Sequence, residues 1–168
     1  MNRKKIYGLI GIFVVLTTLG IASAVTSQVG DVITVLDLVF GPFQIHFGDI
    51  TGGGHIPALN DPKAHATFGI VGQGDDRGQG SVEYQDHGPA KLNIKSTNII
   101  TVVTTADKTK GSIIGSATVN GDGTYPFIIY VEDNGEPGKG VDKFEISLPT
   151  YPHLNGAILS GGNIQIHS

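Results

Sequence analysis

The sequence predicts an all-β protein, an antiparallel β-sandwich of the immunoglobulin-like or jelly-roll-like kind behind an N-terminal signal peptide. Apolar and polar residues alternate along many short segments, and turns rich in Gly, Asn, Asp and Pro recur about every 8 to 12 residues. No segment has the convincing pattern of an amphipathic helix. With 168 residues, 39% of them hydrophobic, the chain is long enough for one domain with a substantial core.

The N-terminus has the features of an export signal. Basic residues at Arg3 to Lys5 precede an apolar run from Ile6 to Leu16, and Ala22 to Ala24 supplies the small residues that a signal peptidase reads. This order predicts that residues 1–24 are a signal peptide, cleaved after Ala24. We therefore expect the protein to be extracellular or at the cell surface.

The competing interpretation of this segment is an uncleaved membrane anchor. Ile6 to Val25 is about long enough to span a bilayer. Thr17, Thr18 and Gly20 interrupt the apolar run where a cleavage region should begin, and this favours cleavage. In either case the rest of the chain lies outside the cytoplasm, and the membrane is reached only through the N-terminal segment.

Residues 25–61 are expected to form an N-terminal strand or arm with loops, in one domain with the core at 62–168. Val25 to Gly41 has apolar residues that fit either a helical stripe or a strand, and its many β-branched residues suit a strand. A short strand, a flexible loop and a turn are expected next, at Phe43–Phe47, Gly52–Gly54 and Ala58–Pro62.

The core of the chain is expected to consist of strands separated by short polar turns. The first strand alternates from Ala64 to Val71 and ends in a glycine-rich loop at 72–80. Asn120-Gly121 is the dipeptide most typical of a tight hairpin. Further strands are expected at Ser81–Asp86, Lys91–Lys95, Asn98–Thr104, Ser112–Val119, Ala157–Leu159 and Asn163–His167.

Thr124 to Leu148 carries the clearest pattern in the sequence, a β-hairpin with one buried face. Its apolar residues occupy alternate positions on both sides of a polar gap from Asp133 to Gly140. Asn134-Gly135 and Pro137-Gly138 in the gap are turn-forming pairs. The residues expected on the buried face are Phe127, Ile129, Val131, Phe144, Ile146 and Leu148.

Several strings of the sequence resemble successive motifs of the post-COAP family, a β-rich module of exported bacterial and archaeal proteins. The resemblance covers about residues 64–167. DNGEPG and GGNIQIH are its more specific strings, whereas AHATFGIVGQ, GSVEYQDHG and the text of the central hairpin are more general. It implies an extracellular β-sandwich that serves as an accessory or surface module, and it carries no catalytic residues over to this chain.

The loop of the central hairpin is the candidate metal site. Asp133, Glu136 and Asp142 bring carboxylates to one hairpin end, and Ca²⁺ prefers such oxygen ligands. We therefore expect these three residues to be the candidate ligands of a calcium ion. The alternative is that Asn134-Gly135 simply forms the turn. Asp75-Asp76 near Arg77 is expected to be a solvated loop.

No catalytic residues are predicted. The six histidines have neither the i, i+4 nor the His-x-His spacing of a local metal site, and there is no G-x-S-x-G motif. Glu83 and Glu145 would suit glycoside hydrolysis if they faced one another, but as strand residues they are more simply exterior charges. With a net charge of -4 and no basic cluster beyond the N-terminus, the chain does not have the features of a nucleic-acid-binding protein.

These observations favour a secreted or cell-surface structural or binding module without catalytic activity. Its expected partner is a cell-surface structure, a polysaccharide or a protein. The first alternative is a self-assembling fibre or surface-layer subunit, in which residues 25–40 are donated as a strand to a neighbouring copy. An extracellular hydrolase is the second alternative.

Overall fold

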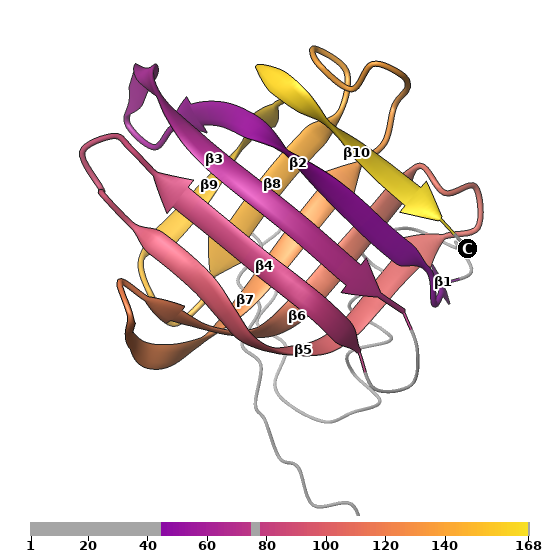
Figure 1. Ribbon diagram of the computed structural model, residues 1–168, viewed down its shortest axis with the longest axis horizontal. Helices are drawn as coiled ribbons and strands as arrows, with labels where there is room; N and C mark the ends of the chain where they lie inside the picture. The colour runs from indigo at the N-terminus through magenta and orange to yellow at the C-terminus, as the bar shows by residue number, and fades with distance from the viewer. Residues whose placement is uncertain (1–44, 75–77, 168) are drawn as a thin grey trace, which may run out of the picture. The chain divides into compact units, whose positions relative to one another are not determined.

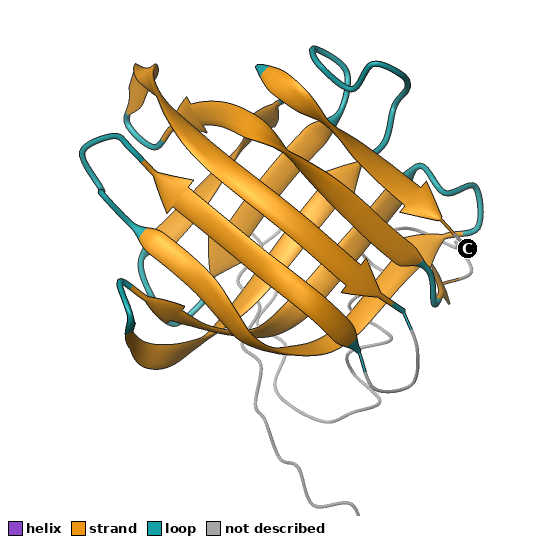
Figure 2. Cartoon of the chain, in the orientation of Figure 1, coloured by secondary structure: helices purple, strands orange, loops and turns teal. Residues whose placement is uncertain are grey.

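The computed structural model describes residues 45–74 and 78–167, and all their regular secondary structure is β-strand (Figure 1, Figure 2). They belong to one compact unit that spans residues 42–168. The all-β, antiparallel prediction is confirmed. The predicted signal peptide at 1–24 and the arm at 25–40 lie outside the described residues. The strands are β1 (Ile45–His46), β2 (Asp49–Ala58), β3 (Asp61–Gln73), β4 (Gln79–Asp86), β5 (Asn93–Thr105), β6 (Lys110–Val119), β7 (Asp122–Glu132), β8 (Lys143–Leu148), β9 (His153–Ile158) and β10 (Gly161–His167).

Nine of these strands form one continuous antiparallel sheet in the order β10-β2-β3-β4-β5-β6-β7-β8-β9, and β1 pairs with the end of β5. From β2 to β9 each strand therefore lies beside its neighbours in the sequence. This order lacks the crossovers of immunoglobulin-like and jelly-roll sandwiches. Hydrophobic alternation showed which faces are buried, but it does not encode how the strands are connected.

The sheet curves so that its two halves face each other. In Figure 1, β10, β2, β3 and β4 cross in front of β7, β8 and β9. β5, which the sequence suggested to be two strands, is one strand of 13 residues whose register with β6 shifts between Ser96 and Asn98 and again between Ile99 and Thr101. Such irregularities bend a strand and increase its twist, and the polar interruption at Ser96-Thr97 marks this bend.

The core lies between the two halves of the sheet. All six apolar residues predicted on the buried face of the β7–β8 hairpin are at most 1% exposed, which confirms that prediction. Phe68 of β3 stacks on Phe144 of β8, with ring centroids 4.0 Å apart, so that the front and back halves are in direct contact.

The turn at Asn120-Gly121 is also as predicted. Both residues have positive φ, 53° and 81°, as the tight hairpin between β6 and β7 requires. Several boundaries differ from prediction; for example, β9 begins earlier, at His153, and β3 and β4 extend into the predicted glycine-rich loop. Asp75, Asp76 and Arg77 lie outside the described residues.

The prediction of a flexible loop at Gly52–Gly54 was wrong, because these residues form the middle of β2. A Cβ atom at Gly52 would lie 2.8 Å from the carbonyl oxygen of Asn163, and one at Gly54 would overlap the carbonyl oxygen of Gly161. The glycines thus allow β10 to approach β2 closely.

The part of the chain that the structure describes contains no helix with the length and apolar character needed to span a membrane.

We predict that Gly54→Ala lowers the free energy of unfolding by about 1 to 3 kcal/mol, because the methyl group pushes β10 away from β2. Gly69→Ala is the matched control. A Cβ atom at Gly69 has no neighbour within 4 Å, and its effect should stay within about 0.5 kcal/mol. Urea denaturation of both variants measures the difference, and equal stabilities would contradict the close-approach explanation.

Candidate functional site

The loop between β7 and β8, residues 133–142, lies against the outer edge of β10 (Figure 1), and we call it the clasp loop. The carboxylate of Asp142 accepts a hydrogen bond from the backbone N–H of Ile164 at 2.9 Å. The carboxylate of Asp133 accepts one from the N–H of Ile166 at 3.1 Å. β10 pairs with β2 along its other edge. The two aspartates therefore take the place of a neighbouring strand's carbonyl groups.

Asp142 is fully buried and is satisfied by backbone N–H groups. Its Oδ2 faces Ile164, and its Oδ1 accepts a hydrogen bond from the N–H of Asn134 at 2.9 Å. Its own backbone N–H donates to Gly138 O at 2.8 Å. A Cβ atom at Gly138 would overlap this carboxylate, so glycine is required for the close fit. A buried carboxylate is costly unless it is hydrogen-bonded, and both oxygens of Asp142 are.

Glu136 contacts β10 through side chains. One of its oxygens accepts hydrogen bonds from the amide groups of Asn163 at 2.9 Å and Gln165 at 3.0 Å. These two hydrogen bonds lower the pKa of Glu136. The side-chain oxygen of Asn163 in turn accepts a hydrogen bond from the N–H of Gly138 at 2.6 Å. All three acids predicted as calcium ligands thus contact β10.

The clasp loop also joins the neighbouring turns. The N–H of Asp133 donates to Thr109 O in the β5–β6 turn, the N–H of Gly140 donates to Leu159 O, and the N–H of Leu159 donates to Asp142 O, each at 2.9 Å. Among the residues that the structure describes, no group of three or more His, Cys, Asp or Glu side chains is placed to hold a metal ion. Calcium binding here stays a prediction from the sequence, and the geometry gives the three acids a structural role.

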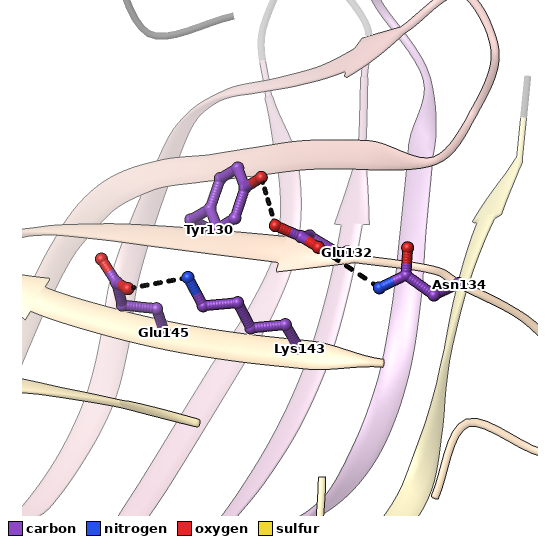
Figure 3. A network of polar contacts seen from close by, with 5 residues as sticks. All are labelled: Tyr130, Glu132, Asn134, Lys143 and Glu145. Carbon is purple, nitrogen blue, oxygen red and sulfur yellow. Dashed lines mark hydrogen bonds and ion pairs between the residues drawn. The ribbon is translucent and has the colours of Figure 1, made fainter. Parts of the chain in front are cut away.

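Beside the clasp loop, five polar residues interact on β7, β8 and the start of the loop (Figure 3). Tyr130 donates to Glu132 at 2.7 Å, and the amide of Asn134 donates to the same carboxylate at 3.2 Å. Lys143 pairs with Glu145 at 3.4 Å and lies 5.2 Å from the centre of the Tyr130 ring. Burial and the hydrogen bond to Glu132 raise the pKa of Tyr130, which keeps it a neutral donor.

A second buried polar cluster joins the end of β4 to the start of β9. The hydroxyl of Tyr84 donates to Asp86 at 3.3 Å and accepts from the amide of Asn155 at 2.8 Å. The same amide donates to Pro57 O at 3.1 Å, which ties β9 to β2. His153 packs against Tyr84 with ring centroids 5.4 Å apart, and both of its ring nitrogens are buried without a hydrogen-bond partner among the described residues.

The outer face of β2 to β5 carries an open groove of about 450 Å³. Gly53 and Gly69 face each other across β2 and β3, so side chains are missing there. Glu83 and Lys95 pair across β4 and β5 at the groove's wall. The residues that line it are Gly52, Gly69, Ile70, Val71, Ser81, Val82, Glu83, Lys95 and Ser96.

The structure does not bring Glu83 and Glu145 together. Glu83 lies in β4 and Glu145 in β8, and three strands of the sheet separate them. Glu83 is opposite Lys95 and Glu145 is paired with Lys143, so both glutamates have a cationic neighbour on the outer surface. This arrangement matches the exterior charges expected from the sequence and not a facing pair of acids.

Three histidines that are far apart in the sequence become neighbours on the outer face of β2, β3 and the end of β4. They are His55, His65 and His87. The spacing of these histidines in the sequence does not predict the cluster, because the cluster depends on the strand register, which the sequence pattern leaves open.

Comparison of this chain with protein-family models, with curated proteins and with solved structures gave no match.

We predict that Asp142→Asn destabilises the protein by about 1 to 3 kcal/mol, because the amide leaves one buried backbone N–H without an acceptor. Asp122→Asn makes the same chemical change at the exposed first residue of β7 and should cost less than about 0.5 kcal/mol. Chemical denaturation compares the two variants. Equal, small effects would show that the Asp142 carboxylate does not hold β10.

A further prediction concerns the pH dependence of the free energy of unfolding. Burial lowers the pKa of His153 below the ordinary value of 6.5, with an opposing contribution from Asp86. The stability that depends on neutral His153 is therefore fully present above pH 6.5. It is lost as the pH falls from there toward the lowered folded-state pKa, because the unfolded chain binds a proton that the folded chain does not.

His153→Leu removes this proton uptake, so the variant should lose less stability than the parent between pH 7.5 and pH 5. Unfolding free energies at the two pH values measure this difference. An identical loss in both proteins would rule out His153 as its source.

Proposed function

We propose that this protein is an exported β-module that binds a protein partner at the cell surface through the outer face of β2 to β5, without chemistry of its own. The observation that carries this proposal is the open groove on that face. Its glycine floor lets an extended segment approach the backbone, and its wall offers hydroxyl groups and both signs of charge from Ser81, Glu83 and Lys95. Val71, 45% exposed, adds an apolar contact.

The lining favours a polypeptide over a polysaccharide. Sugar-binding faces commonly use aromatic side chains that stack on the rings, whereas the groove is lined by glycine, serine, aliphatic and charged residues. An extended peptide can instead use Val71 for an apolar side chain and the Glu83–Lys95 pair for polar groups.

Membership of the post-COAP family is part of the same proposal. The two more specific strings that resemble it, DNGEPG at 133–138 and GGNIQIH at 161–167, contact each other in this structure. This contact supports the proposal that both strings belong to one module, because two motifs that are joined through hydrogen bonds form one structural unit. The resemblance also supports an extracellular location and a sandwich-like accessory role.

We predict that Gly69→Arg abolishes binding of peptides selected from a random library on the full chain, because the side chain fills the groove where nothing lies within 4 Å of its Cβ atom. Leu154→Arg, at an exposed position of β9, is the control and should keep binding. A parallel glycan array tests the polysaccharide alternative. Peptides that bind Gly69→Arg as well as the parent, or glycans that bind only the parent, would contradict the proposal.

A second candidate function is self-assembly by strand addition. β9 is the last strand of the sheet, pairs only with β8 among the described strands, and exposes Leu154 (42%) and Ile158 (47%). Such an edge can accept a strand from another copy, for which residues 25–40 are the proposed donor. Light scattering would show assemblies that both Leu154→Arg and deletion of 25–40 abolish. Assemblies that survive both changes would exclude this mode.

A further inference from the structure

The histidine cluster is built by the register of three strands. His55 is in β2 opposite Thr67 of β3, and His65 of β3 is opposite Pro57, so the two histidines are diagonal neighbours. The N–H of His87, just after β4, donates to His65 O at 3.0 Å, which continues the β3–β4 pairing by one residue and sets His87 beside His65.

All three side chains lie on the outer face of the sheet. Their neighbours Ile56, Ala66 and Asp86 are at most 2% exposed and point inward. Because successive side chains of a strand alternate between faces, the adjacent histidines point outward. His65 and His87 are exposed and His55 is half-buried, so an ion from solvent can reach them.

Two of the imidazoles are already in contact. The ring centroids of His55 and His65 are 4.7 Å apart, with an angle of 64° between the rings. Among the described residues, neither ring has a hydrogen-bonding partner. The His55 ring lies over Gly161 of β10, where a Cβ atom would be 2.5 Å from its Cε1 atom. Zinc binds imidazole nitrogens at about 2.0 to 2.1 Å, so two rings at this separation can share one ion.

The third ring needs a rotation to join them. His87 Nε2 lies 3.4 Å from Thr67 Oγ1, at the long limit of a hydrogen bond, so little is lost when the ring turns away. Cross-strand neighbours have Cβ atoms about 4.5 to 5.5 Å apart, which places His87 within reach of an ion on His65. As described, the three rings do not yet surround one point.

We propose that His55, His65 and His87 form a surface site for a divalent transition metal of the imidazole-binding class, represented by Zn²⁺, with His87 turning from Thr67 to complete it. Three imidazoles leave a fourth tetrahedral position for water or for an outside ligand. The site rests on the histidine geometry alone and does not depend on the proposed groove function.

The test is isothermal titration of the full chain, prepared without a polyhistidine tag, with Zn²⁺ at pH 7.5. One ion per chain is expected. His55→Gln, His65→Gln and His87→Gln should each weaken binding by at least about tenfold, because each removes one ligand. His167→Gln, at an exposed position of β10 outside the cluster, is the matched control and should bind as the parent does.

Circular dichroism of each variant shows whether it is folded, so lost binding can be separated from lost structure. NMR spectra of the imidazole groups should show shifts at the three cluster residues and not at His167 when Zn²⁺ is added. The proposal is overturned if the parent shows no binding heat with millimolar Zn²⁺, or if binding survives in the His55→Gln/His65→Gln double variant. It is also overturned if His87→Gln behaves like His167→Gln.

Discussion

The fold depends on how the outer edge of β10 is satisfied. An open sheet ends in two strands whose unpaired N–H and C=O groups invite pairing with other chains. Here the outward N–H group of Ile166 donates a hydrogen bond to the carboxylate of Asp133, and that of Ile164 donates one to the carboxylate of Asp142. The hairpin that supplies them, β7–β8, belongs to the opposite half of the sheet. One set of hydrogen bonds therefore covers an edge and fastens the two halves together.

This arrangement explains why an acidic loop with ligand-like composition sits beside a strand rich in glycine and amides. Gly138 leaves room for the Asp142 carboxylate, and Asn163 connects Gly138 to Glu136. The far edge, β9, is held differently: the side-chain amide of Asn155 donates hydrogen bonds to Pro57 O of β2 and to the Tyr84 hydroxyl of β4. The two edges thus have unequal protection, and β9 is the one that offers exposed apolar residues to a partner.

The sequence allowed the strands to be predicted where alternation was regular, and failed where a residue's role was set by a distant neighbour. Phe127 to Val131 and Asn120-Gly121 are read from local pattern and turn chemistry, and both predictions hold. Gly52–Gly54 looks like a loop until β10 is placed against it, and β5 looks like two strands because its bulges interrupt the alternation. The partners of Asp142 and the meeting of His55 with His65 depend on register, which no local pattern specifies.

Hydrogen exchange at the amides of Ile164 and Ile166 tests the central claim most directly. If the clasp loop covers β10 as described, both amides exchange as slowly as the β10 amides that pair with β2, because each is held in a hydrogen bond. Exchange at the rate of exposed amides, with slow exchange kept at the β2-facing positions, would show that the edge is open and would contradict the account.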